Sequence, residues 1–226
     1  FTETVDFDPG PNTFNLTSAG FEDVFICKFN GTGNFLWAKF LGGTGSDFSK
    51  SMAVDRNGSG DLYTIGSFRG TVDFDPGAGS FHLTSQGGSD IYISKIDGLG
   101  NFVWAGAMGG PGDDSGYSIA LDDGGSGDIY AAGGFEGTVD FDLGPSTVSL
   151  TSVGGTDIFI SKFDREGAFL WAKAMGGSKD DSGTSLAIDP EGSGDVYTIG
   201  HFEGTSDFDP GGGSFNLMSA GNQDIF

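Results

Sequence analysis

Two aspartates flanking one phenylalanine occur four times in the chain, within "TVDFDPG" (twice), "TVDFDLG" and "TSDFDPG". Residues i and i+2 of a β-strand share a face, so each pair would present two carboxylates together, with the phenylalanine pointing inward. Two adjacent like charges are costly unless they are neutralised, and Ca²⁺ prefers such oxygen ligands. The predicted calcium ligands are Asp6, Asp8, Asp73, Asp75, Asp140, Asp142, Asp207 and Asp209.

The alternative interpretation makes these aspartates solvated turn formers, because aspartate at a strand end hydrogen-bonds its own backbone. The pattern D-x-D-x-G resembles the start of an EF-hand calcium loop, but it lacks the third acidic position and the distal glutamate. The formal charge of -22 must be balanced by cations, which favours calcium. Both interpretations therefore stay open at the level of sequence.

Three further sets of residues recur once in each repeat. The tryptophans could stack on sugar rings in one shallow site per repeat, but their apolar neighbours favour a core position with the indole N–H hydrogen-bonded inside. One aspartate set is expected to cap or brace the following strand, and the lysines to lie along the sheet and reach a local aspartate. The sets are Trp37, Trp104 and Trp171; Asp47, Asp114 and Asp181; and Lys28, Lys95 and Lys162.

Catalysis has little support in the sequence. His82 and His201 occupy non-equivalent positions of the repeat, so they form no recurring metal or nucleophile constellation. Carboxylate pairs could serve a glycosidase, but four copies argue against one privileged active site. We expect a protein that is not an enzyme.

The elements that position these residues repeat with a fixed period. Phe1, Phe68, Phe135 and Phe202 are each 67 residues apart, which divides the chain into repeats 1–67, 68–134, 135–201 and a partial copy, 202–226. The 43 glycines exclude helices of ordinary length. Short aromatic and β-branched runs bounded by turn residues predict strands. In the second copy these are Thr71–Asp75, Ser80–Thr84, Ile91–Ile96, Phe102–Met108, Ser118–Asp122 and Ile129–Ala132.

The predicted fold class is all-β. Runs such as "DIYISKI" are apolar on both faces, which favours small antiparallel sheets stacked face to face in a β-propeller, with a β-helix as the second choice. One blade would contain four strands, with the Asp-Phe-Asp hairpin inserted between the second and third and projecting at a rim. The four are Ser118–Asp122, Ile129–Ala132, Ile158–Phe163 and Phe169–Met175. A ring needs about 4 to 8 blades, so we expect a longer natural chain or several chains to complete it.

A family resemblance is carried by "DIFISKFDREGAFLWAKAMGGSKDDSGTSLAIDPEGSGDVYTIGHFEGTSDFDP", which is Asp157–Pro210. The order of an Asp-aromatic-Lys strand, a glycine turn, a tryptophan strand, Gly-Gly and a Tyr-x-x-Gly strand resembles the SBBP family of bacterial β-propeller repeats. All three full copies carry the pattern, and the Asp-Phe-Asp hairpin is an addition to it. The resemblance implies a secreted or cell-surface bacterial protein, with no agreed biochemical activity.

Composition limits the partners. A charge of -22 repels nucleic acid and anionic lipid, and no apolar run reaches the roughly 18 residues of a membrane span. Cys27 is the only cysteine, so an intrachain disulfide is excluded. The predicted function is a non-enzymatic extracellular structural or adhesive module, stabilised by calcium, whose partner is a protein or glycan at a surface. The alternative is a carbohydrate-binding propeller.

Overall fold

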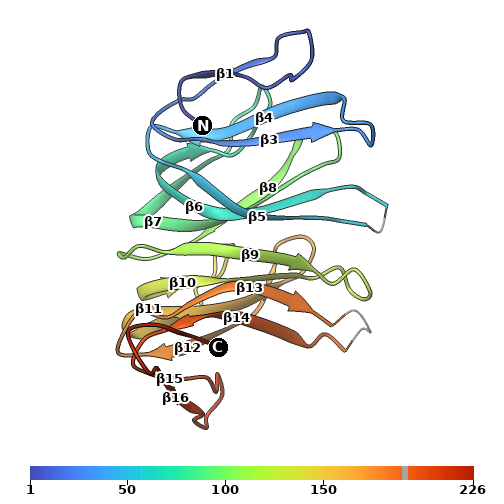
Figure 1. The fold of residues 1–226 in the computed structure, drawn as a ribbon. Coiled ribbons are helices and arrows are strands. Elements are labelled where there is room, and N and C mark those ends of the chain that lie inside the picture. Colours follow the sequence, from blue (N-terminus) through green and yellow to red (C-terminus); the bar gives the residue numbers. More distant parts are fainter. Residues whose placement is uncertain (57, 190–192) are drawn as a thin grey trace.

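The computed structural model describes residues 1–56, 58–189 and 193–226, and within these residues every regular element is a β-strand. The strands form antiparallel sheets that stack in chain order from the N-terminal to the C-terminal end (Figure 1). They are β1 (Thr4–Asp6), β2 (Asn15–Thr17), β3 (Val24–Phe29), β4 (Phe35–Gly43), β5 (Phe48–Val54), β6 (Leu62–Asp73), β7 (His82–Ile96), β8 (Phe102–Met108), β9 (Ser115–Leu121), β10 (Ile129–Asp140), β11 (Ser149–Phe163), β12 (Phe169–Gly177), β13 (Ser182–Ile188), β14 (Val196–Phe202), β15 (Thr205–Asp207), β16 (Asn216–Met218) and β17 (Asp224–Ile225). The predicted all-β class is confirmed.

One sheet motif recurs with the sequence repeat. Strands β5, β6, β7 and β8 pair antiparallel in that order, and so do β9, β10, β11 and β12. The register is also the same, since Leu62 pairs with Ile96 and Ile129 pairs with Phe163, each 67 residues further on. Four-stranded antiparallel sheets of this kind are the units of a propeller. Closure into a ring stays a prediction.

The Asp-Phe-Asp hairpin differs from the sequence prediction. It is not a separate insertion, because β10 and β11 run without a break from the sheet into the hairpin. A register shift between Glu136 and Thr138 marks the junction, where Gly137 has a φ of 75°, a conformation that favours glycine. The hairpin therefore bends away from its own sheet while remaining part of the same two strands.

The hairpin also pairs with the preceding sheet. The Gly-Gly segment that ends each tryptophan strand pairs with the aspartate strand of the next hairpin: Gly42 with Asp73, Gly109 with Asp140 and Gly176 with Asp207. Each hairpin thus links two consecutive sheets, which was not expected of an element projecting freely at a rim.

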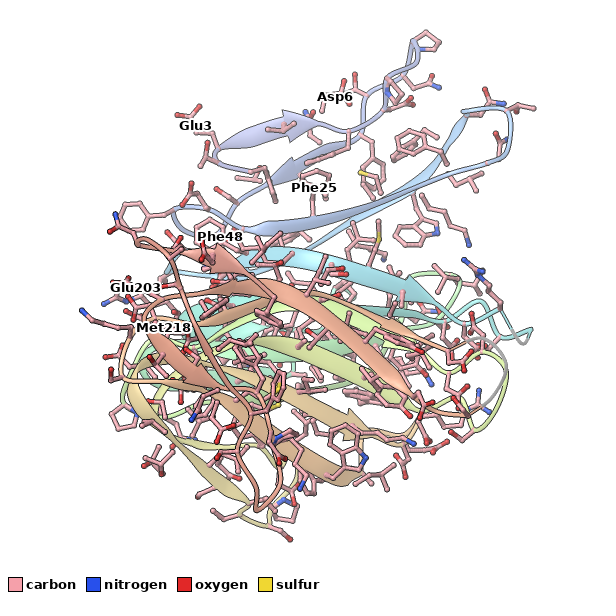
Figure 2. All side chains as sticks on the ribbon, turned by 60° about the horizontal axis from the view of Figure 1, so that its bottom comes forward. Glu3, Asp6, Phe25, Phe48, Glu203 and Met218 are labelled. Atoms are coloured by element: carbon pink, nitrogen blue, oxygen red, sulfur yellow. The ribbon has the colours of Figure 1, made fainter. Side chains whose placement is uncertain are left out.

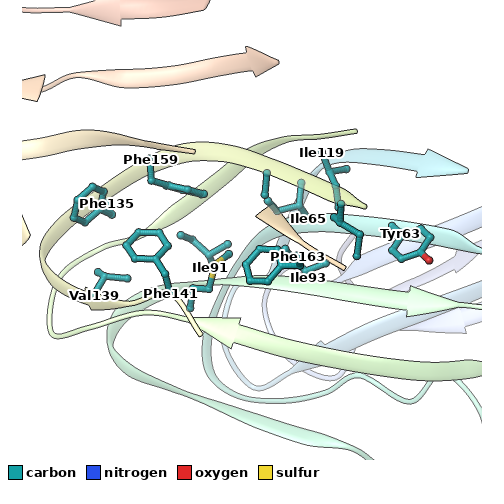
Figure 3. Close-up of a cluster of buried hydrophobic side chains, with 13 residues drawn as sticks. Tyr63, Ile65, Ile91, Ile93, Ile119, Phe135, Val139, Phe141, Phe159 and Phe163 are labelled. Atoms are coloured by element: carbon teal, nitrogen blue, oxygen red, sulfur yellow. The ribbon is translucent and has the colours of Figure 1, made fainter. Parts of the chain in front are cut away.

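The hydrophobic core lies between the stacked sheets (Figure 3). Phe141, the central residue of a hairpin triplet, is fully buried with its ring 5.3 Å from Phe135 and 5.2 Å from Phe159. Phe74 is buried in the same way in the preceding copy. The predicted inward direction of these two phenylalanines is confirmed. Burying each large apolar side chain contributes about 1.5–3 kcal/mol to folding.

Candidate functional site

The aspartates of the hairpin triplets act as turn formers in the structure. Asp73 Oδ1 accepts hydrogen bonds from the backbone N–H of Asp75 (3.0 Å) and of Phe81 (2.8 Å), and Asp75 Oδ1 accepts one from Gly77 (2.8 Å). Strand β6 ends at Asp73, so the two carboxylates do not share a strand face as the sequence argument assumed. The same three bonds recur in the other copies, around Asp6 and Asp8, Asp140 and Asp142, and Asp207 and Asp209.

These pairs do not gather further ligands. Among residues 1–56, 58–189 and 193–226, no cluster of three or more His, Cys, Asp or Glu side chains has a metal-binding arrangement. Asp6 lies on the N-terminal hairpin, at the edge of the stack (Figure 2). Calcium binding by the hairpin aspartates stays a prediction, and their observed hydrogen bonds are those of the turn-former alternative.

The recurring lysine and tryptophan lie in one row across each sheet. Lys95 on β7 pairs with Tyr63 on one side and Trp104 on the other. Its ammonium group is 3.1 Å from a carboxylate oxygen of Asp61 and 5.0 Å from the centre of the Tyr63 ring. The predicted reach of this lysine to a local aspartate is confirmed. Its equivalent, Lys162, lies 2.7 Å from Asp128.

The tryptophans are partly buried in this row. Trp104 meets the Tyr63 ring edge-on at 6.2 Å and packs against the core. Its Nε1 atom is buried with no hydrogen-bond partner in the described chain, so the predicted internal bond of the indole is not found. Trp171 repeats the contact with Tyr130 at 6.2 Å, and Trp37 lies 5.9 Å from the Lys28 ammonium group. This packing agrees with the core interpretation, while sugar binding stays a prediction.

The aspartate set expected to brace a strand connects two sheets. Asp114 is fully buried, and its carboxylate accepts the N–H of Gly110 (3.0 Å) and of Glu136 (2.9 Å). Gly110 follows β8, whereas Glu136 belongs to β10 of the next sheet. The bracing role is therefore real, but it acts between sheets and not on the strand that follows the aspartate. Asp47 and Asp181 make the equivalent bonds.

A second buried aspartate set was missed by the sequence analysis. Its members begin the Asp-aromatic-Lys strands, precede the bracing aspartates by 24 residues, and are 2%, 1% and 1% exposed: Asp23, Asp90 and Asp157. Asp90 Oδ2 accepts the N–H of Gln86 at 2.9 Å. In all three copies the other oxygen, Oδ1, is buried without a hydrogen-bond partner in the described chain. The constant spacing between the two aspartate sets was the available signal.

The two sets meet at the Gly-Gly segment. A Cβ atom on Gly109 would lie 2.1 Å from Cγ of Asp90, so only glycine leaves room for this carboxylate, and the next residue, Gly110, donates its N–H to Asp114. The side chains of Asp23 and Asp47 are likewise within hydrogen-bonding reach of each other. Each repeat thus brings two buried carboxylates together.

The electrostatics follow from this burial. Loss of solvation raises the pKa of Asp114 to about 7, and the neighbouring charge of Asp90 raises it further. Burial also raises the pKa of Asp90 and of Asp47 to about 6, and for Asp47 the charge of Asp23 acts in the same direction. Such pairs can hold a proton or a cation, and their oxygens are hard ligands suited to calcium.

Comparison with known proteins gives two partial similarities, and no family model matches the chain. The chain is 26% identical over 232 residues to the regulatory protein FlaEY of Caulobacter vibrioides, covering 94% of this chain and 23% of that protein. It is 28% identical over 191 residues to an uncharacterised WD repeat-containing protein of Acanthamoeba polyphaga mimivirus, covering 76% of this chain and 13% of that protein. The chain therefore spans less than a quarter of either relative's length.

The second similarity agrees with the sheet motif, because WD repeats form four-stranded propeller blades. No helix among the described residues is long and apolar enough to cross a membrane. The chain is thus an all-β array of repeated antiparallel sheets that is similar to part of a WD repeat-containing protein.

Proposed function

We propose that the chain is a non-enzymatic, β-propeller-like interaction module whose two end sheets each accept another sheet of the same repeat. The observation that carries this proposal is that positions buried inside the array become exposed at its ends. The similarity to a WD repeat-containing protein supports the propeller part of the proposal. No reaction is included, because the recurring carboxylates hold turns and link sheets.

The N-terminal end sheet exposes an apolar face. Phe25 on β3 is 49% exposed and Met52 on β5 is 66% exposed, whereas their equivalents in the next repeat, Tyr92 and Ile119, are 0% and 5% exposed. Phe25 and Met52 line one groove, and Figure 2 shows Phe25 at the N-terminal end of the stack. Since a sheet of the next repeat buries these positions inside the array, a further sheet has the complementary shape and chemistry.

The C-terminal end sheet shows the same property. Tyr197 and Ile199 on β14 are 63% and 60% exposed, whereas the equivalent Tyr130 and Ala132 are 1% and 0% exposed. The two ends expose opposite faces of the repeat, so one copy of the array can join its C-terminal face to the N-terminal face of another. Such a contact is heterologous and gives a ring or an open filament.

Self-association of the 226-residue chain tests the proposal. We expect sedimentation velocity to show concentration-dependent association, which Met52→Glu or Ile199→Glu reduces by at least tenfold in association constant, because either charge would be buried at the junction. Val153→Glu is the matched control, since Val153 is 75% exposed and its equivalent, Gln86, is also exposed. A chain that stays monomeric at every concentration, or that associates equally in all variants, would refute the proposal.

The location and surface role are proposed from the family resemblance alone. A secreted or cell-surface site and an adhesive role require labelling of the intact protein on cells with an impermeant reagent. Sugar binding is the second candidate function, and the partial exposure of Trp104 is the observation in its favour. Loss of glycan-array binding in a Trp104→Ala variant that remains folded would support it.

A further inference from the structure

The buried aspartate pairs leave one oxygen per repeat unexplained. Oδ1 of Asp23, Asp90 and Asp157 is buried without a hydrogen-bond partner, at equivalent positions of three copies. A buried carboxylate oxygen without a partner loses its hydration with nothing in return, which costs several kcal/mol for a charged group. One orphan could be an accident of side-chain placement, whereas three equivalent ones indicate that each repeat has a place for a ligand.

The ligand must be positively charged and must bind oxygen. The unpartnered oxygen of Asp90 belongs to a carboxylate whose like-charged neighbour is Asp114. Asp114 accepts two backbone N–H groups and Asp90 accepts one, while a carboxylate offers about four acceptor positions, so both side chains retain lone pairs. No lysine or arginine ion pair to either aspartate is found among the described residues.

We infer that each repeat binds one hard divalent cation, with calcium the best match, between its two buried aspartates. The three sites are Asp23 with Asp47, Asp90 with Asp114, and Asp157 with Asp181. A divalent ion cancels both charges of a pair, whereas a shared proton cancels only one, and a buried uncompensated charge is costly. The sites are distinct from the hairpin aspartates and do not depend on the end-face proposal.

The three sites are not identical. In the third, the hydroxyl of Ser206 donates to both oxygens of Asp181 at 2.9 and 3.0 Å. The first two copies have Val72 and Val139 at that position, which offer no such donor. The hydroxyl partly compensates the Asp181 charge, so the third site binds its cation more weakly than the other two.

Calcium titration of the whole chain is the test. After dialysis against EDTA and transfer to calcium-free buffer at pH 7.5, isothermal titration with CaCl₂ is expected to show two tight sites and a third weaker one. At calcium 100 times above Kd, each occupied site raises Tm by about 5–10 °C. Four equal sites would point instead to the hairpin pairs, and their appearance would contradict the inference.

Matched variants assign the sites. Asp90→Asn keeps the size and the Gln86 contact but removes one charge, so the number of tightly bound calcium ions should fall by one. The amide can donate to Asp114, so the calcium-free variant should melt at or above the calcium-free parent. Asp73→Asn, in the hairpin, is the control and should leave the number unchanged. Absence of calcium binding by the parent chain, or loss only in the hairpin variant, would overturn the inference.

Discussion

The glycine against the buried aspartate allows one substitution to be developed in detail. In Gly109→Ala, the added Cβ atom would lie 2.1 Å from Cγ, 2.2 Å from Oδ2 and 2.6 Å from Oδ1 of Asp90. Side-chain atoms do not approach a Cβ atom so closely, so the carboxylate must move. It is held by the N–H of Gln86 and enclosed on all sides, so the movement breaks that bond or shifts the backbone.

The expected loss of stability combines two effects. Overpacking in a filled interior costs about 1–3 kcal/mol. Loss of the charge-assisted bond to Gln86 costs about 1.5–3 kcal/mol more if the carboxylate swings away. For a chain of 226 residues, about 2–4 °C of Tm corresponds to each kcal/mol, so we expect a fall of about 5–15 °C.

Thermal unfolding followed by circular dichroism, in EDTA, is the assay. Gly31→Ala is the control, because nothing lies within 4 Å of its added Cβ atom, and its φ is not in the left-handed region. That variant should melt within about 2 °C of the parent or slightly above it. If Gly109→Ala also melted with the parent, the close approach of Asp90 to this glycine would be refuted, together with the steric reason for the Gly-Gly segment.

Three further predictions follow from buried groups. In EDTA, Tm should rise as the pH is lowered from 8 to 5, because Asp114, facing Asp90 and Asp113, has a folded pKa raised to about 7, so its stabilising protonated form is lost as pH rises; a flat or opposite profile in this window would contradict it. Lys162→Met should lower the free energy of unfolding by about 1–3 kcal/mol in urea denaturation, since the carboxylate 2.7 Å away loses its cation, and an unchanged midpoint would show the pair to be neutral. Phe135→Ala should cost about 3–5 kcal/mol by the same method, because its ring is fully buried, and a loss below 1 kcal/mol would mean that the core collapses to fill the space.

Much of the fold follows from local sequence patterns. Phe102–Met108 was predicted as a strand and is β8 with the same bounds. Other predicted strands, such as Ile91–Ile96, are parts of longer ones, since β7 extends from His82 to Ile96. Glycine was taken as a strand end, whereas Gly70, with a φ of 76°, allows a bulge within the continuous strand β6. Single-residue patterns cannot distinguish a break from a bulge, because both use glycine.

The candidate site was less predictable. The adjacent aspartates of "DFD" are conspicuous in the sequence, yet each forms a local turn. Asp90 and Asp114 are separated by 24 residues, and only the packing of one sheet on the next brings them together. Asp90 also begins a strand of ordinary appearance, "DIYISK", where an aspartate is expected at the surface. Burial of that residue depends on tertiary contacts that no local pattern reports.

The pairing of each hairpin with the preceding sheet has a consequence for cooperativity. In a linear array, stability is a sum of the intrinsic stability of each repeat and of terms between nearest neighbours. Here the neighbour term includes the backbone ladder between Gly109 and Asp140, and its equivalents between Gly42 and Asp73 and between Gly176 and Asp207, in addition to apolar packing. A sheet that melts therefore removes hydrogen bonds from the sheet before it, so unfolding that begins at one end passes along the chain as a single transition and does not stop at a repeat boundary.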